Sequence, residues 1–287
     1  MTQNPTVSTY RMTVSCSDRP GLVAEVSGAL FGAGANILEA QHFADALSGR
    51  FFMRLVFEVE GPDDGLDAAL APLREAGMAV ELRRTSDRQR LMLLVSKFDH
   101  CLVDLLYRHR IGELDAEIVG IVSNHPADVL QTWLPGHIPF HHLPVNAATK
   151  SRQEGQIKQL VEETRADLIV LARYMQILSD DLSAFLAGRC INIHHSFLPG
   201  FKGARPYHQA HARGVKMIGA TAHYVTSDLD EGPIIRQEVE RVTHADSPED
   251  MIRKGRDVER RVLARAVRDH LEKRVLIDGH RTIVFGD

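Results

Sequence analysis

The pattern of apolar residues changes near residue 85, and this change constrains the fold more than any other feature of the sequence. Residues 10–84 follow the order strand, helix, strand, strand, helix, strand, with alternating apolar residues in the strands and helical spacing between them. After residue 90, continuous apolar runs such as "RLMLLVSK" and "AEIVGIVSN" alternate with helical segments. Such runs are typical of a parallel sheet covered on both faces. We therefore expect two domains of different architecture.

The domain boundary is expected in the charged stretch "RRTSDRQR". We predict an α/β protein: a ferredoxin-like α+β domain over residues 8–84, a linker over 85–90, and a mostly parallel, Rossmann-like domain over 91–287. A length of 287 residues suits two domains. In parallel sheets of this kind, ligands lie outside the carboxyl ends of the strands. The segments "DLIVLARYM" and "CINIHHSF" should therefore line one crevice.

The composition indicates a small-molecule partner. A net charge of −4, from 34 basic and 38 acidic side chains, predicts neither nucleic-acid binding nor attachment to an anionic membrane. The amino terminus lacks the features of a signal peptide, and no apolar run reaches membrane-spanning length. Three widely separated cysteines, Cys16, Cys101 and Cys190, favour a reduced compartment. We expect a cytoplasmic protein.

The stretch "CINIHHSFLPG" holds the strongest chemical signal. Asn192 and His194 lie two residues apart on a strand and therefore face the same side, while His195 faces the other. Asp230 follows a later strand in "ATAHYVTSDLDEGP". An amide can donate to an oxyanion, an imidazole can carry a proton, and a carboxylate can orient either group.

Three interpretations of these residues remain open on spacing alone. A metal site is disfavoured because adjacent strand residues diverge, and "HQAH", at residues 208–211, is expected on a surface helix. The residues could also be ordinary buried polar groups near a turn. Metal-free acid–base catalysis accounts for Asn, His and Asp together. None of these residues identifies a substrate.

The segment "INIHHSFLPGFKGARPYHQAHARGVKMIGATAHYVTSDLDEGPIIRQ" resembles the formyltransferase-type family of folate hydrolases and transferases. The shared pattern is Asn-x-His, then Ser-x-Leu-Pro, then His-x-Val-Thr-x-x-Leu-Asp-x-Gly-Pro. The resemblance implies a formyltransferase-type domain that acts on 10-formyltetrahydrofolate without a metal or other cofactor. It also implies that Asn192, His194 and Asp230 are catalytic and that water attacks the formyl carbon, which yields formate and tetrahydrofolate.

The same resemblance implies where the folate binds. The pterin is expected against "RYMQIL" and the loop 225–230. The implied substrate-binding residues are Tyr174, Gln176, Ile177, Leu178, Ser196, His223, Val225 and Thr226.

One departure from the family pattern favours hydrolysis over transfer. The ribonucleotide-using transferases of the family have a glycine-rich phosphate loop after the first strand of this domain, where this chain reads "VSKFDHCL". Two alternatives stay open: a formyltransferase to an amine, with an acceptor site near Lys97, and a folate-binding sensor without turnover.

The amino-terminal segment "SDRPGLVAEVSGALFGAGANI" resembles ACT regulatory domains. Asp18, Gly21 and Leu22 lie where a strand turns into a helix, whose free amides could hold a carboxylate, and Asn36 follows that helix. An ordinary helix cap is the competing interpretation. The resemblance implies regulation by an amino acid, with glycine or methionine as candidates. Exposed sheet edges in such domains predict a homo-oligomer.

Overall fold

The computed structural model describes residues 7–61, 65–132, 134–200 and 206–286. The chain forms two compact units. The first comprises Met1–Arg88 with Glu272–Leu276 and Ile283–Asp287, and the second comprises Gln89–Leu271 with Ile277–Thr282.

The first unit has the expected order of strands and helices. Its elements are β1 (Val7–Ser17), α1 (Leu22–Gly32), β2 (Ala35–Asp45), β3 (Arg50–Glu60), α2 (Leu66–Glu75) and β4 (Ala79–Arg84). The sheet order is β2-β3-β1-β4, and every neighbouring pair is antiparallel. This is the split arrangement of a ferredoxin-like domain.

The core of this unit lies between the sheet and its two helices. Met12 and Val14 of β1 and Phe57 of β3 are fully buried, as are Leu30 of α1 and Leu70 of α2. The alternating strand pattern sends one set of side chains onto the apolar stripes of the helices.

The other face of β3 carries a buried arginine whose partners include the end of the chain. Arg54 is 2% exposed, and its guanidinium donates to the carbonyl of Glu272 at 3.1 Å and to Glu39 at 2.7 Å. The carboxyl-terminal segments therefore pack within the first unit, whereas the sequence placed all of residues 91–287 in the second. A strand of the second unit also begins at Gln89, inside the expected linker.

The second unit is built around seven strands. Its elements are β5 (Gln89–Val95), α3 (His100–Arg110), β6 (Ala116–Ser123), the short helix η1 (Ala127–Val129), β7 (Phe140–His142), α4 (Lys150–Glu163), β8 (Leu168–Leu171), α5 (Asp180–Phe185), β9 (Cys190–His194), α6 (Pro206–Ala212), β10 (Met217–Tyr224), β11 (Ile234–Arg241) and α7 (Pro248–Leu271). A two-stranded pair, β12 (Val275–Asp278) and β13 (Arg281–Val284), follows α7.

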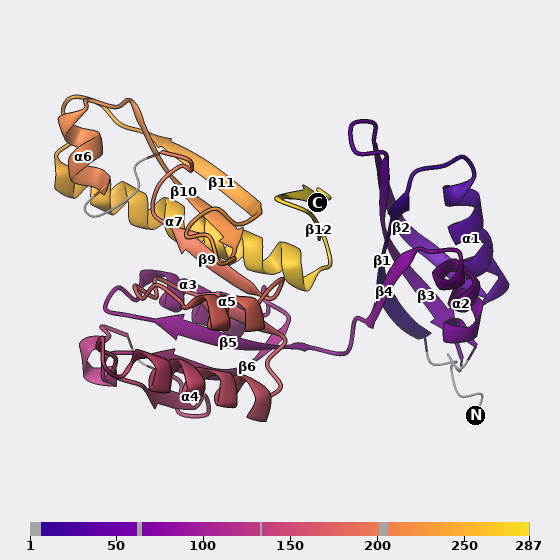
Figure 1. Cartoon of the computed structure of the whole chain (residues 1–287), viewed down its shortest axis with the longest axis horizontal. Helices are drawn as coiled ribbons and strands as arrows, with labels where there is room; N and C mark the ends of the chain where they lie inside the picture. The colour runs from indigo at the N-terminus through magenta and orange to yellow at the C-terminus, as the bar shows by residue number, and fades with distance from the viewer. Residues whose placement is uncertain (1–6, 62–64, 133, 201–205, 287) are drawn as a thin grey trace. The chain divides into compact units, whose positions relative to one another are not determined.

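The central sheet has the order β11-β10-β9-β8-β5-β6-β7. Strands β7, β6, β5, β8 and β9 are parallel, and β10 and β11 add antiparallel pairs at one edge. Helices α4 and α5 pack on one face around Ile169 and Leu171. Figure 1 shows the long helix α7 running along β9, β10 and β11, which it contacts. This mostly parallel sheet agrees with the predicted fold class.

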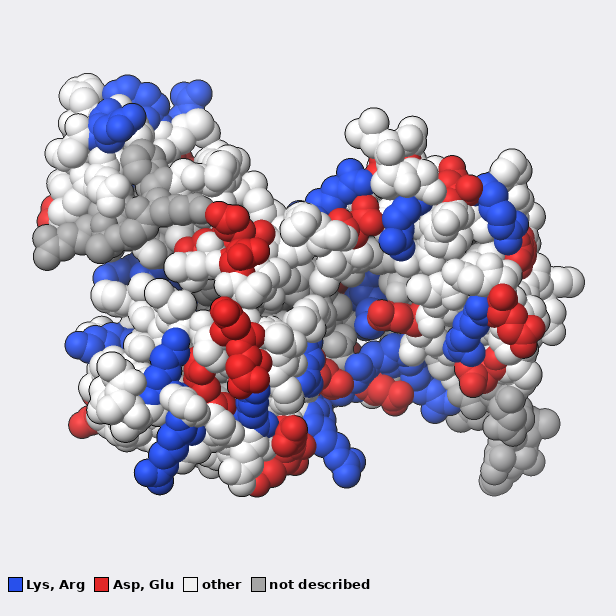
Figure 2. All heavy atoms as spheres, viewed as in Figure 1, with Lys and Arg blue, Asp and Glu red and all other residues white. Residues whose placement is uncertain are grey.

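Two surface features bear on the possible partners. Within the described part of the chain, no helix is both long enough and apolar enough to span a bilayer. Acidic and basic side chains are interspersed over the face seen in Figure 2. This mixture is consistent with the small net charge of −4.

Candidate active site

The pairing of β8, β9 and β10 brings the candidate polar side chains together. Leu171 of β8 pairs with Asn192 of β9, and Asn192 in turn lies opposite His223 of β10. His194 lies opposite Thr221 in the same register. Because alternate residues share a face, the amide of Asn192 and the imidazole of His194 point to the same side of the sheet.

Hydrogen bonds fix the tautomer of His223 and the orientation of Asn192. Nδ1 of His223 lies 2.9 Å from the carbonyl oxygen of Tyr224, which can only accept, so Nδ1 carries the proton. In the neutral ring Nε2 is then an acceptor, and it lies 3.3 Å from Nδ2 of Asn192. One amide hydrogen of Asn192 is therefore engaged, and the second is available to another acceptor.

Asp230 lies against both histidines. Its Oδ2 is 3.2 Å from Nδ1 of His194, and its Oδ1 is 3.7 Å from Nε2 of His223. The side chain is 16% exposed and that of His194 is 8% exposed. Nε2 of His194 has no hydrogen-bond partner among the described residues.

The contacts of Asp230 determine its charge. Burial by itself would raise the pKa of this carboxyl, but its contacts with His194, at 3.2 Å, and with His223 outweigh burial and hold the pKa well below its usual range. Asp230 is therefore a carboxylate at neutral pH. Its Oδ2 atom faces Nδ1 of His194.

A sharp turn delivers Asp230 to this position. Asp230 has a φ of 58°, which is uncommon for a residue with a side chain. Two residues later, a Cβ on Gly232 would lie 1.7 Å from the carbonyl oxygen of Tyr224, so only glycine lets the returning chain pass there. The same carbonyl holds Nδ1 of His223. The turn and the catalytic geometry therefore depend on one another.

The three candidate catalytic residues line a cavity of about 370 Å³ at the carboxyl ends of β8 and β9. Seven of the eight expected substrate-binding residues line it as well: Tyr174, Gln176, Ile177, Leu178, His223, Val225 and Thr226. The cavity therefore collects residues from the segment after β8, from β9, and from β10 with its following loop.

Ser196 is the exception among the expected substrate-binding residues. It lines a separate, more apolar cavity with Phe197 and Ile218, and its hydroxyl donates to the carbonyl of Gly200 at 2.8 Å. Its backbone carbonyl accepts a hydrogen bond from Thr221. In this structure Ser196 thus shapes the loop after β9.

Buried polar side chains hold the segment that follows β8. The hydroxyl of Ser96, at the end of β5, accepts from the amide of Met175 at 3.0 Å. Gln153 of α4 donates to the hydroxyl of Tyr174 at 2.5 Å. Glu154 accepts from the amide of Ser179 at 2.9 Å. The phenol of Tyr174 is therefore already engaged by the protein, while its ring lines the cavity.

Two further polar residues line the cavity without a role assigned from the sequence: Arg173, within "RYMQIL", and His195, which was expected on the opposite face of its strand. Arg173 follows β8 with a φ of 66° and is buried. His195 also lines the cavity, with its ring centroid 5.2 Å from that of His194, because β9 ends at His194 and the alternation of side chains ends with it. Burial, together with the nearby charge of Arg173, lowers the pKa of His195 to about 4. The signal for Arg173 was a charged residue directly after an apolar run.

The amino-terminal unit has a cavity of its own, of about 530 Å³, at the start of α1. Asp18, Gly21 and Leu22 line it, as expected. Gly21 precedes the helix with a φ of 91°, which exposes the first helical amides. Asn36 is not among the lining residues: it lies on β2, where its amide donates to Glu58 at 2.9 Å.

Comparison with known proteins first defines the class of protein to which the two domains belong. Residues 89–267 match the family model described as "Formyl transferase", and residues 10–75 match the model described as "ACT domain". The class is therefore an ACT domain joined to a formyl transferase domain, which confirms the predicted fold class.

Full-length relatives narrow the class to one family. The chain is 47% identical to the formyltetrahydrofolate deformylase of Corynebacterium sp. (strain P-1), over 96% of this chain and 97% of the relative. A crystal structure of the formyltetrahydrofolate deformylase from Burkholderia mallei ATCC 23344 has a TM-score of 0.91 at 50% identity and covers 97% of this chain and 100% of its own. Glycinamide ribonucleotide transformylase 1 from Symbiobacterium toebii has a TM-score of 0.62 at 27% identity and covers 69% of this chain and 95% of its own. The chain belongs to the formyltetrahydrofolate deformylase family.

Proposed function

We propose that this protein is a hydrolase that converts 10-formyltetrahydrofolate and water into formate and tetrahydrofolate. The observation that carries this function is the convergence of Asn192, His194 and Asp230 on one cavity in a chain similar over its full length to deformylases. An amide donor, an imidazole and an ionised carboxylate are the groups that hydrolysis of a formyl amide requires.

In the proposed mechanism, water bonds to the formyl carbon and the carbonyl oxygen becomes an oxyanion. The unengaged amide hydrogen of Asn192 and the protonated ring of His194 stabilise that oxyanion. Asp230 is ionised because its pKa is low, so it can orient the water, and the contacting pair of Asp230 and His194, 3.2 Å apart, takes up the proton that the water gives up. The C–N10 bond then breaks, and the His194–Asp230 pair returns the proton to N10.

The pterin of the substrate is placed against residues 176–178 and the loop 225–230. Ile177 is 62% exposed and Met175 is 50% exposed, so the cavity presents apolar surface to a flat ring. Gln176 lies at the same wall. Arg173 adds a basic side chain to the lining of the same cavity.

The reaction is proposed to need no metal or other cofactor. Asp230, His194 and His223 already make mutual contacts that orient a proton-transfer site. Incubation with a chelator followed by desalting should leave the rate of formate release unchanged. A loss of rate that zinc restores would contradict this part of the proposal.

The amino-terminal unit is proposed to bind an amino acid, glycine or methionine, as a regulator. ACT domains commonly bind amino-acid effectors, and the cavity at the start of α1 offers helical amides to a carboxylate. A homo-oligomer is proposed because β2 and β4 are the edges of the four-stranded sheet.

A cytoplasmic location is proposed because all three cysteines are unpaired.

The test is formate release from purified protein and 10-formyltetrahydrofolate, with and without an amine acceptor. Formate should appear with water alone, at a rate that the amine does not change. Turnover that requires an amine would make the protein a transferase. Folate binding without any turnover would support the sensor alternative instead.

A further inference from the structure

A buried ion-pair network lies beside the catalytic cavity and takes no part in the proposed reaction. Its centre is Glu259 of α7, which is 1% exposed. Tyr207 of α6 donates to Oε1 at 2.7 Å, and Nε2 of His100 lies 2.8 Å from Oε2. Nε of Arg173 lies 3.4 Å from the same oxygen. We call these four residues the Glu259 network.

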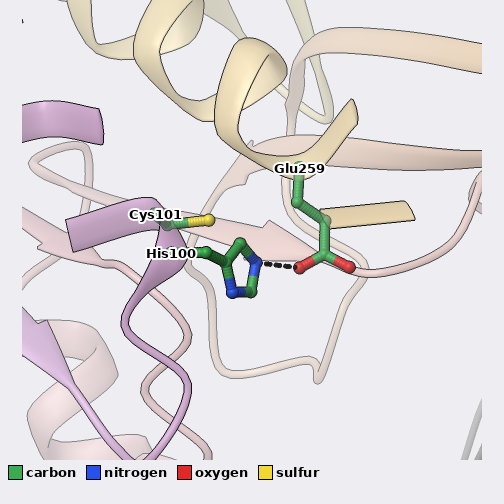
Figure 3. Close-up of side chains that lie close together, drawn as sticks. All are labelled: His100, Cys101 and Glu259. Atoms are coloured by element: carbon green, nitrogen blue, oxygen red, sulfur yellow. Dashed lines mark hydrogen bonds and ion pairs between the residues drawn. The ribbon is translucent and has the colours of Figure 1, made fainter. Parts of the chain in front are cut away.

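The network joins three elements at the edge of the cavity. Figure 3 shows the ring of His100, at the start of α3, pointing to the carboxylate that descends from α7. Arg173 also lines the catalytic cavity, and the ring of Tyr207 lies 6.4 Å from that of His195. The guanidinium of Arg173 stands 5.8 Å from the ring of Phe98, in the turn between β5 and α3. The carboxyl end of β5 is thus covered by side chains.

The contacts of the network keep Glu259 ionised and engage both of its carboxylate oxygens. Burial would raise the pKa of Glu259, but the hydrogen bond from His100 and the charge of Arg173 lower it, so the carboxylate stays ionised. Cys101 lies close enough for His100, Cys101 and Glu259 to be considered as metal ligands. Both oxygens of Glu259 are already engaged, one of them by a cation, and burial raises the pKa of the Cys101 thiol. These contacts disfavour an ion there.

The position of the network indicates a role in substrate choice. Ligands of open α/β sheets bind outside the carboxyl ends of the strands. Here the cavity covers the ends of β8 and β9, while the partly buried side chain of His100 and the buried side chain of Arg173 lie at the end of β5, beside the half-exposed ring of Phe98. The transformylase with the same fold is named for a ribonucleotide, a second substrate much larger than water. A second substrate of that size would need room beside the cavity for its amine to reach the formyl carbon.

We propose that the Glu259 network closes the acceptor side of the site, so that water reaches the formyl carbon and an amine does not. This proposal rests on the proposed hydrolase function and adds the determinant of its selectivity. The residues are positioning residues: they restrict access without contacting the reacting atoms.

Opening the network should permit formyl transfer. In that reaction the amine nitrogen bonds to the formyl carbon, the C–N10 bond breaks, and N10 takes up the proton that the amine gives up. The opening variant is His100→Ala with Tyr207→Ala, which creates space but keeps the Arg173–Glu259 pair. His100→Ala alone is a milder variant, in which Glu259 retains Tyr207 and Arg173.

The measurement is the ratio of formylglycinamide to formate produced from 10-formyltetrahydrofolate in excess glycinamide. This ratio does not depend on the fraction of protein that is folded. With the wild-type protein the ratio should stay at the background of the assay, because only formate is released. The opened variants should raise the ratio by about tenfold or more over that background. Cys101→Ala, a change at the neighbouring buried residue, should leave the ratio at that background.

The other outcomes would overturn the proposal. Opened variants that still release formate but form no formylglycinamide would show that the network does not exclude amines. Formylglycinamide from the wild-type protein would show that no exclusion exists. A wild-type protein that releases no formate would instead refute the hydrolase function, and the proposal would fall with it.

Discussion

The charge of Asp230 depends on its two histidine contacts more than on its burial. A half-buried carboxyl without partners would have a raised pKa, yet here the contacts with His194 and His223 lower it. The tautomer of His223 is in turn set by the carbonyl of Tyr224, and its Nε2 orients Asn192. Each candidate catalytic side chain is therefore oriented by a second polar group, which is the arrangement that proton transfer requires.

We predict that Asp230→Asn lowers kcat by about 10²- to 10⁴-fold with a small change in KM, because the carboxylate acts on the water and the proton and contributes little to folate binding. Steady-state formate release measures both constants. Asp228→Asn is the matched control: this residue lines the same cavity but is exposed, and its side chain should matter little. Full turnover by the Asp230 variant would refute its assigned role, as it would for Asp230→Ala.

His195 predicts a specific loss of stability in acid. Its pKa is lowered from 6.5 to about 4, so between these values the unfolded chain binds a proton that the folded chain does not. The free energy of unfolding must therefore fall as the pH decreases through this window, by at most about 3 kcal/mol.

His195→Gln should remove this part of the pH dependence. Denaturant unfolding of variant and wild type at neutral pH and near the lower end of the window measures the difference. His208→Gln, at an exposed position, is the control. Identical pH dependence in wild type and His195→Gln would show that His195 is not held neutral by burial.

At the scale of single elements, the turn between β10 and β11 decides whether the site is assembled. The amide of Tyr224 donates to the carbonyl of Pro233 at 2.9 Å, and the amide of Val225 donates to Cys190 at 2.8 Å. These bonds fasten both ends of the loop that carries Asp230. The register of β10 against β11 shifts between Ala222 and His223, where the strand turns towards the cavity.

We predict that Gly232→Ala lowers both kcat and the free energy of unfolding. A Cβ at this position would lie 1.7 Å from the carbonyl oxygen of Tyr224, so the turn must move and carry Asp230 with it. Formate release and thermal unfolding should be measured together. Gly155→Ala in α4 meets no atom within 4 Å and should stabilise the chain by about 0.4–1 kcal/mol without affecting kcat. An active Gly232→Ala protein would contradict the contact.

At the scale of the whole molecule, the end of the chain belongs to the unit formed by its beginning. Glu272–Leu276 and Ile283–Asp287 group with the first unit, and Arg54 of β3 is bound by the carbonyl of Glu272. Arg274 lies 3.6 Å from Glu39, the other partner of Arg54. A contact network of this kind ties segments more than 200 residues apart into one folded unit.

We predict that Arg54→Met destabilises the first unit by about 2 kcal/mol, because the partly exposed Glu39 and the partly buried Glu272 carbonyl lose a charged donor. Hydrogen exchange in β3 should become faster. Truncation after Leu271 should have the same effect. Arg74→Met removes only an exposed pair with Asp67 and should change stability by less than about 1 kcal/mol. Unchanged exchange in both the Arg54 variant and the truncated chain would show that the tail does not stabilise this unit.

The sequence by itself determined the two architectures and most of the candidate site. Periodicity of two in the first unit and continuous apolar runs in the second distinguish an antiparallel sheet from a parallel one. The reason is that a strand buried on one face alternates apolar and polar residues, whereas a strand buried on both faces is apolar throughout. The two-residue spacing of Asn192 and His194 indicates a shared face for the same local reason.

Only the tertiary structure decided the contacts between distant segments. Glu259 lies in a highly charged helix, yet its place in the apolar stripe between Gly255 and Val262 buries it against His100, Tyr207 and Arg173. The separation of Ser196 from the cavity and the packing of residues 272–276 on β3 were equally unpredictable. Local patterns specify which side of an element is buried, but which residues meet there depends on how the sheet orders its strands.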